Sequence, residues 1–284
     1  MSEQNKKYLI IGQGDIGLPV TNNLANQGLD VTGLARQNRK HYDLAKSAQF
    51  LQLDARALSA KQLSDFHRIA IIVTPDDYSK SGYENSYLKI CQQLASLSLP
   101  NLERIVFISS TGVYGQDNGD WIDDTVKPAP LADDSTSNFI LKAEQALQSG
   151  FHNKAIIIRP SGIYGRKRLM RVRQAQKNEK DLIAREHWTN RIMDRDLVKI
   201  IEKVLTIASP KPLYLATDYL PVTNFELTSW LSEKLNSTKP VVDNSKTAVT
   251  GKRLHSNIPR DWLTFPDWQV GYRDILQHST ADDN

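Results

Sequence analysis

Three glycines near the N-terminus have a spacing that suits phosphate binding. Gly12, Gly14 and Gly17 form Gly-x-Gly-x-x-Gly, with Asp15 and Ile16 between the last two. The first glycine permits a tight turn, the second lets the backbone approach a pyrophosphate, and the third lets a helix pack closely on a strand. The N–H groups and positive dipole end of that helix would face the phosphates. The motif predicts a dinucleotide site; an ordinary strand-to-helix turn is the alternative.

The segments around these glycines match what such a site requires. Residues 8–11 predict a buried strand before the glycines, residues 18–28 predict a helix that ends at a glycine, and residues 29–34 predict a second strand. This order forms a βαβ unit, which makes dinucleotide binding a more specific prediction than the glycines alone support.

Basic residues after the second strand indicate which dinucleotide is bound. NAD-binding proteins usually carry Asp or Glu at this strand end for the ribose 2′-hydroxyl, whereas Arg accommodates a 2′-phosphate. Arg36 stands here, with Arg39 close behind it. We therefore expect NADP rather than NAD, with a solvated basic loop as the alternative. Asp54 follows the third predicted strand, where it is expected to meet the adenine amino group. Thr74 ends the fourth predicted strand, where the loop is expected to pass along the cofactor.

Apolar runs alternate with helical patterns through the first half of the chain. This alternation predicts βαβ units and a parallel sheet, hence an α/β fold with a Rossmann-type doubly wound sheet. The runs expected to form strands are 8–11, 29–34, 50–53, 69–73, 104–108 and 155–158. Helices are expected at about 83–97 and 134–148.

Several motifs in one order resemble a known family. The glycine turn is followed by Ser-Ser-x-x-Val-Tyr-Gly at 109–115, a helix lysine, and Arg-Pro-x-x-Ile-Tyr-Gly at 159–165. This series resembles the NAD-dependent epimerase/dehydratase group, the extended short-chain dehydrogenases/reductases, over about residues 6–220. The resemblance implies a cofactor contact at Pro160 and a small C-terminal substrate lobe.

The resemblance also implies a catalytic Ser/Thr, Tyr and Lys. Ser110 matches the residue that holds the substrate oxygen, and Lys142 matches the lysine that binds the nicotinamide ribose. The tyrosine that serves as acid and base is missing, because Asn138 stands one helical turn before the lysine. An amide cannot exchange a proton near neutral pH. The dehydratase branch is disfavoured too, because Thr111 and Gly112 replace its Asp-Glu pair.

The domain organisation expected from these patterns has three parts. Residues 6–165 are expected to form the NAD(P)-binding Rossmann domain. Residues 166–278 are expected to form a mixed segment with the substrate lobe, in which residues 190–220 return to the Rossmann domain. Residues 279–284 are expected to be a disordered tail.

Composition favours a small-molecule partner. The 284 residues carry a formal charge of +4, and the single cysteine, Cys91, lies in an apolar helical pattern and is expected to be buried. No His, Cys, Asp or Glu cluster has the spacing of metal ligands. We expect no nucleic-acid or membrane partner, a monomer or homodimer, and a cytoplasmic location, because no apolar run resembles a signal peptide or a membrane span.

One basic cluster leaves several interpretations open. Its members are Arg166, Lys167, Arg168, Arg171 and Arg173. A solvated helix face is the simplest interpretation, and binding of a phosphate-bearing substrate or cofactor is the next. Nucleic acid is least favoured, because no aromatic residues interleave for base stacking.

Two functions are consistent with these features. The first is an NADP(H)-dependent oxidoreductase or epimerase acting on a small polar or sugar-like substrate. The second is a catalytically inactive NADP-binding sensor or regulatory protein, which the absence of the family tyrosine would explain.

Overall fold

The computed structural model describes residues 3–37, 43–129, 132–133, 135–177 and 181–279. The chain divides into two compact units, each built from several segments. Unit 1 consists of Met1–Val113, Pro130–Arg159 and Leu197–Tyr214, and unit 2 consists of Tyr114–Ala129, Pro160–Asp196 and Leu215–Asn284. The predicted boundaries at 6–165 and 166–278 stay predictions.

A seven-stranded sheet runs in the order β12-β7-β5-β4-β1-β2-β3. Its strands are β1 (Lys7–Ile11), β2 (Asp30–Ala35), β3 (Gln49–Gln52), β4 (Arg68–Ile71), β5 (Arg104–Ile108), β7 (Ala155–Pro160) and β12 (Leu213–Ala216). Every neighbouring pair from β3 to β7 is parallel. From β3 to β7 the order is β3-β2-β1-β4-β5-β7, where β7 is the sixth strand of this sheet along the chain. This is the 3-2-1-4-5-6 order of dinucleotide-binding sheets, which confirms the predicted Rossmann-type fold.

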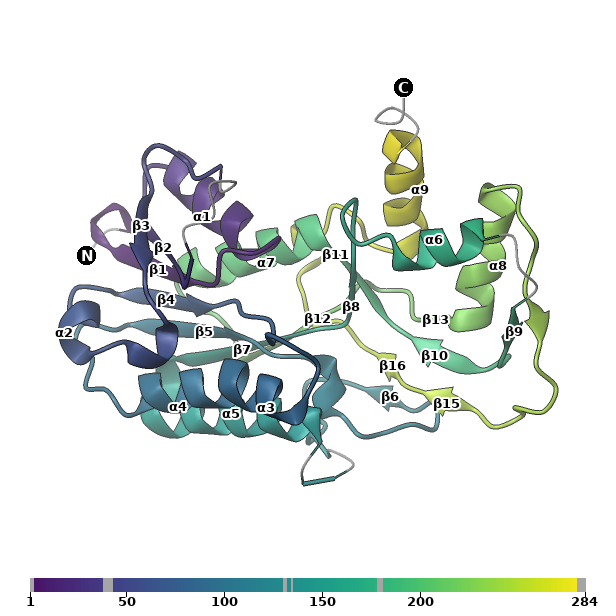
Figure 1. Cartoon of the computed structure of the whole chain (residues 1–284), viewed down its shortest axis with the longest axis horizontal. Helices are drawn as coiled ribbons and strands as arrows, with labels where there is room; N and C mark the ends of the chain where they lie inside the picture. The colour runs from purple at the N-terminus through teal and green to yellow at the C-terminus, as the bar shows by residue number, and fades with distance from the viewer. Residues whose placement is uncertain (1–2, 38–42, 130–131, 134, 178–180, 280–284) are drawn as a thin grey trace. The chain divides into compact units, whose positions relative to one another are not determined.

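Helices cover both faces of this sheet. Figure 1 shows α3, α4 and α5 on one face, and α1 and α7 on the other. These helices are α1 (Gly17–Asn26), α3 (Lys80–Tyr83), α4 (Lys89–Ala95), α5 (Thr136–Phe151) and α7 (Asp194–Thr206), and the short α2 (Ala60–Leu63) precedes β4. Because both faces are covered, every residue of β4, β5 and β7 is buried.

The helix predicted over 83–97 begins earlier and is interrupted. Its first turn starts at Lys80, because the Ser79 hydroxyl accepts a hydrogen bond from Gly82 N at 3.0 Å and caps the helix. A π-helical turn, Glu84–Leu88, then separates α3 from α4. Helical periodicity alone does not reveal such an insertion, since apolar residues on both sides still face the sheet.

Caps and burial set the ends of the other predicted helices. Gly28 follows α1 with a φ of +81°, as its predicted role at the end of that helix requires. Ser135 caps α5, and that helix extends past the predicted end at Gln148 because Phe151 is buried. Thr223 caps α8 (Asn224–Lys234) by accepting a hydrogen bond from Glu226 N at 3.1 Å.

Unit 2 contains short strands and three helices around a separate core. Its helices are α6 (Met170–Gln176), α8 and α9 (Trp268–Ser279). Its strands are β6 (Trp121–Ile122), β8 (Gly162–Tyr164), β9 (Leu182–Ile183), β10 (His187–Thr189), β11 (Arg191–Met193), β13 (Val222–Thr223), β14 (Val241–Val242), β15 (Thr250–Gly251) and β16 (Arg253–Leu254). Residues 280–284, most of the predicted tail, lie outside the described residues.

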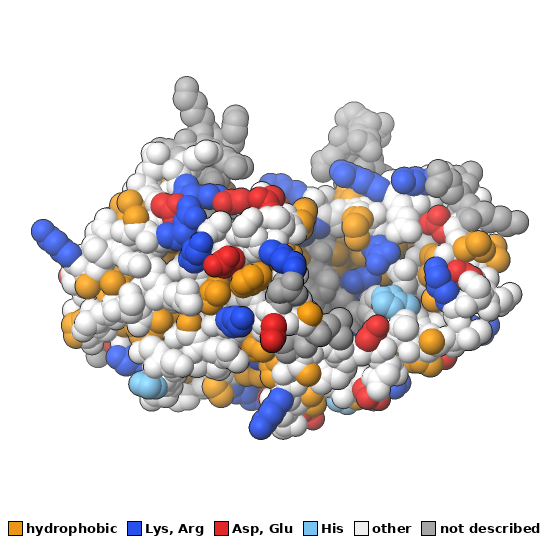
Figure 2. Space-filling model, turned by 60° about the horizontal axis from the view of Figure 1, so that its bottom comes forward, with side chains coloured by type: hydrophobic (Ala, Val, Ile, Leu, Met, Phe, Trp, Pro, Cys, Tyr) orange, Lys and Arg blue, Asp and Glu red, His pale blue; other side chains and the backbone are white. Residues whose placement is uncertain are grey.

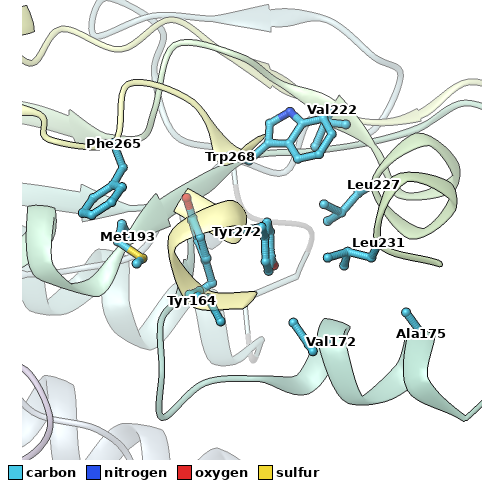
Figure 3. Packing of buried hydrophobic residues seen from close by; sticks show 11 residues of the cluster. Tyr164, Val172, Ala175, Met193, Val222, Leu227, Leu231, Phe265, Trp268 and Tyr272 are labelled. Carbon is cyan, nitrogen blue, oxygen red and sulfur yellow. The ribbon is translucent and has the colours of Figure 1, made fainter. Parts of the chain in front are cut away.

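Aromatic side chains dominate the core of unit 2. Figure 3 shows Tyr164 and Tyr272 side by side, and their rings stack with centroids 4.5 Å apart. Trp268 packs edge-on against Trp230 at 5.4 Å. Burying each such ring contributes about 1.5–3 kcal/mol, so this aromatic core holds together strands that are too short to be stable alone.

Candidate functional site

The glycine turn has the shape that a pyrophosphate requires. Gly12 has a φ of +96°, and a Cβ there would lie 2.0 Å from the Ile72 carbonyl oxygen. A Cβ at Gly17 would lie 1.8 Å from the Gly12 carbonyl oxygen, so α1 approaches the turn too closely for any side chain. A Cβ at Gly14 would meet no atom within 4 Å. The first and third glycines are therefore required by the fold, while the space beside the second is open.

The N-terminus of α1 follows this turn directly. Its N-cap residue is Ile16, whose side chain cannot accept a hydrogen bond, and no acidic residue lies in the first turn. Ile16 is buried, whereas Asp15 is exposed beside it. A helix start that lacks a capping side chain in the described structure is a suitable place for a phosphate. The turn and this helix therefore fit the phosphates of a dinucleotide.

Three residues predicted to lie along the cofactor each follow a strand of the parallel sheet. Arg36 follows β2, Asp54 follows β3 and Thr74 follows β4, so parallel pairing places all three at one edge of the sheet. Thr74 is exposed. Arg39, the fourth residue predicted here, lies outside the described residues.

Arg36 and Asp54 each have a charged partner that the sequence did not reveal. Arg36 forms a two-point ion pair with Asp76, in which Nη1 donates to Oδ2 at 2.7 Å and Nη2 donates to Oδ1. Asp54 accepts from Arg56 through Nη2 at 2.6 Å and through the backbone N–H at 2.9 Å. These hydrogen bonds lower the pKa of both carboxyls below their ordinary value.

A buried network holds the end of β5 against α5. The Arg159 guanidinium donates to both oxygens of Glu144, with Nε at 2.9 Å and Nη2 at 2.6 Å. The Ser109 hydroxyl donates to the same carboxylate. All three residues are at most 5% exposed. This network fixes the backbone directly before Ser110.

Ser110 lies at the expected place after β5, and a hydroxyl from α5 is close to it. Ser110 Oγ accepts a hydrogen bond from Gly112 N at 3.0 Å. A Cβ built on Gly112 would lie 3.2 Å from Ser110 Oγ and 3.4 Å from Ser137 Oγ. The two hydroxyls therefore border the same small space, which the absence of a side chain at Gly112 leaves open. Nothing in the sequence pattern singled out Ser137.

Asn138 and Lys142 occupy different environments on α5. Asn138 is buried, and its amide donates to the Asp133 carbonyl oxygen, so this side chain turns back toward the residues before the helix. Lys142 is exposed. The position of the family tyrosine is therefore occupied by an amide that bonds the backbone. Pro160, the remaining predicted contact, is buried at the end of β7.

Two arginines of unit 2 have buried N–H groups without a partner among the described residues. These groups are Nε of Arg171 and both Nε and Nη2 of Arg191. Burial, and then the charge of Arg191, lowers the pKa of Arg171 from its ordinary value. Arg191 Nη1 would lie 2.5 Å from a Cβ at Gly162, so glycine at that position gives the guanidinium its room. Buried guanidinium donors without a partner among the described residues favour an anion.

Arg171 also connects to a cavity within unit 2. Its Nη1 donates to Gln174 Oε1, and Gln174 Nε2 donates to Asp181 Oδ2, each at 3.1 Å. Gln174 and Asp181 line a hollow of about 440 Å³ together with His187 and Asn224. The side-chain oxygen of Asn224 is buried and has no partner among the described residues. The cavity is polar and large enough for a small ligand.

In the described part of the chain, no group of three or more His, Cys, Asp or Glu residues could hold a metal ion. None of the helices described is both long and apolar enough to cross a membrane. Cys91 is buried, which raises the pKa of its thiol and confirms the prediction of a core residue. Figure 2 shows Lys and Arg mixed with Asp and Glu on one face, without a broad basic surface.

Comparison with known proteins identifies the family. The model of the NAD dependent epimerase/dehydratase family matches residues 8–203. The chain therefore belongs to this family of nucleotide-binding oxidoreductases and epimerases. Protein YeeZ of Escherichia coli K12 is 28% identical over 174 residues, which cover 56% of this chain and 60% of YeeZ. The chain thus spans about 60% of the length of the curated relatives it matches.

Solved structures show the same fold over nearly the whole chain. A Methylobacillus flagellatus protein assigned by name to the NAD-dependent epimerases/dehydratases is 29% identical, with a TM-score of 0.77 over 98% of this chain and 99% of that one. UDP-glucuronic acid 4-epimerase from Bacillus cereus, in complex with NAD, is 16% identical, with a TM-score of 0.72 over 95% and 99%. MoeE5, in complex with UDP-glucose and NAD, is 16% identical, with a TM-score of 0.74 over 98% and 100%.

Proposed function

We propose that this protein binds NADP and acts as an oxidoreductase or epimerase on a small, polar, sugar-like substrate. The glycine turn carries the proposal, because backbone atoms exclude side chains at Gly12 and Gly17 while the space beside Gly14 is open. Bound there, NADP would supply hydride transfer at its nicotinamide. Solved structures of the same fold are named as complexes with NAD, which supports a dinucleotide as the ligand.

The side chains near Ser110 would orient the substrate. The Gly112 N–H already donates to Ser110 Oγ, which leaves the hydroxyl proton of Ser110 able to donate to a substrate oxygen. Ser137 Oγ borders the same space and is a second donor. Lys142 is assigned to the nicotinamide ribose by its match to the family lysine. Because Asn138 cannot transfer a proton, the proton would come from water or from another side chain.

Arg36 is assigned to the 2′-phosphate of NADP, so Arg36→Ala should weaken NADP much more than NAD. A guanidinium–phosphate contact is a charge-assisted hydrogen bond worth about 1.5–3 kcal/mol, which corresponds to roughly tenfold to a hundredfold in affinity. Titration calorimetry measures the dissociation constants of NADP and of NAD, for the variant and for the unmodified protein. If the unmodified protein binds NAD more tightly than NADP, the cofactor assignment is wrong.

The arginines of unit 2 favour an anionic ligand for that unit. Arg171 and Arg191 have buried donors without a partner among the described residues, and a phosphate or carboxylate would satisfy them. Sugar nucleotides and sugar acids carry such groups, and two structural neighbours are named as complexes with UDP-glucose or as acting on UDP-glucuronic acid. The phosphate-bearing substrate considered for the basic cluster is therefore the favoured alternative for Arg171.

An assay of hydride transfer separates an enzyme from a sensor. We expect the nicotinamide absorbance of the bound cofactor to change when sugar nucleotides or carbonyl sugars are added, with anionic compounds at least about tenfold more effective than neutral ones. The buried amide of Asn138 favours the second candidate, an NADP-binding sensor without turnover. Tight binding of NADPH without any absorbance change or epimerised product across the panel would support the sensor.

A further inference from the structure

The two terminal nitrogens of the Arg36 guanidinium already have a hydrogen-bond partner in this structure. Both terminal nitrogens of its guanidinium donate to the two oxygens of Asp76, with Nη1 to Oδ2 at 2.7 Å. The side chains are 54% and 44% exposed, so solvent and a ligand can reach the pair. A guanidinium binds a carboxylate and a phosphate with the same two-point geometry. A phosphate that takes these two N–H groups must therefore displace Asp76 from them.

The topology brings these residues together although they are 40 positions apart. Arg36 directly follows β2, and Asp76 lies in the loop that follows β4. These strands lie on either side of β1 in a parallel sheet, so both loops leave the same edge. This is also the edge at which the glycine turn lies, which places Asp76 on the same side of the sheet as the proposed dinucleotide site.

Charges of both signs surround this pair in the described residues. Arg56 pairs with Asp54, and the charges of both members influence the pKa of Arg36 or Asp76. Asp77 adds a third carboxylate beside Asp76, so carboxylates outnumber the described cations here. The hydrogen bond from Arg36 lowers the pKa of Asp76, so Asp76 stays ionised at neutral pH and keeps its hold on Arg36. A phosphate that enters here must displace Asp76 and approach its negative charge.

We infer that Asp76 is a specificity-determining residue, which competes with the 2′-phosphate of NADP for the guanidinium of Arg36. The inference rests on the proposed function of Arg36. NAD carries only a hydroxyl at this position, so it binds while the Arg36–Asp76 pair stays closed. The 2′-phosphate of NADP competes with Asp76 for the Nη1 and Nη2 donors of Arg36. Asp76 thus reduces the preference for NADP that Arg36 alone would give, and it makes the protein more tolerant of NAD.

The test is Asp76→Asn, with dissociation constants of both dinucleotides measured by calorimetry. The neutral amide is a weaker competitor for the guanidinium than a carboxylate. An exposed ion pair contributes about 0.2–1 kcal/mol, so NADP should bind about twofold to fivefold more tightly in the variant. NAD should change by less than about twofold. Unchanged or weaker NADP binding would overturn the inference, and so would a large loss of NAD affinity, since Asp76 would then hold the ribose itself.

Asp77→Asn is the matched control. It removes the same charge one residue away, from a carboxylate that accepts from Ser79 N at 2.8 Å instead of from Arg36. If both variants strengthen NADP equally, general electrostatics and not competition is responsible, and the inference fails.

Repeating the Asp76→Asn substitution in Arg36→Ala protein separates this inference from the proposed function. In Arg36→Ala protein, Asp76→Asn should no longer improve NADP binding, because no guanidinium is left to release. If Arg36→Ala itself leaves NADP affinity unchanged, the cofactor assignment fails. If Arg36→Ala weakens NADP but Asp76→Asn in the unmodified background has no effect, only the role of Asp76 is wrong.

Discussion

Gly14→Val should abolish NADP binding, at least a hundredfold loss by calorimetry, while changing the free energy of unfolding by less than about 0.5 kcal/mol. No atom lies within 4 Å of a Cβ at this position, and Gly14 is exposed, so the fold has room for the side chain. The same open space is where the phosphates would lie. A valine side chain there would block the ligand without disturbing the native backbone.

Gly17→Val should lose NADP binding for a different reason from Gly14→Val, because this glycine is required by the fold. Its Cβ would lie 1.8 Å from the Gly12 carbonyl oxygen, so the variant should unfold more easily and lose binding for structural reasons. Urea unfolding of both variants provides the comparison. A stable Gly14→Val protein that binds NADP with unchanged affinity would place the dinucleotide elsewhere.

The central sheet could be predicted because its strands are marked by local patterns. β5 has the bounds that its apolar run indicated, since a strand covered on both faces needs a continuous apolar run and ends where polar residues begin. The short strands of unit 2 could not be predicted in this way. Pairs such as β11 with β8 involve only three residues each, and their pairing depends on tertiary packing, not on a repeated pattern.

The sequence could single out candidate site residues only where spacing alone indicates a chemistry. The glycines and Arg36 could be proposed because each stands directly after a predicted strand. The partner of Arg36, Asp76, could not be predicted, because the order of the strands brings it to Arg36 and no local sequence pattern marks it. Ser137 was missed for a related reason. The family pattern directed attention to Asn138, the next residue, whose side chain bonds the backbone instead.

Glu144 and Arg159 form the buried ion pair whose disruption should cost most in stability. Glu144 is 1% exposed and Arg159 5% exposed, and two hydrogen bonds of 2.9 and 2.6 Å join them. Replacing one partner leaves the other charge buried and unpaired. Glu144→Gln or Arg159→Met alone should therefore lower the free energy of unfolding by about 3–5 kcal/mol, measured by urea unfolding.

The double variant Glu144→Leu/Arg159→Met tests whether pairing is the cause. With both charges removed, neither has to be desolvated, and a packed apolar pair is often as stable as the ion pair it replaces. Ser109 would lose its acceptor, a cost of about 1–3 kcal/mol if the hydroxyl stays buried. The double variant should therefore be more stable than either single one. A loss equal to the sum of the single losses would show that the two residues stabilise the fold independently, and that α5 and β7 are held together by packing rather than by this pair.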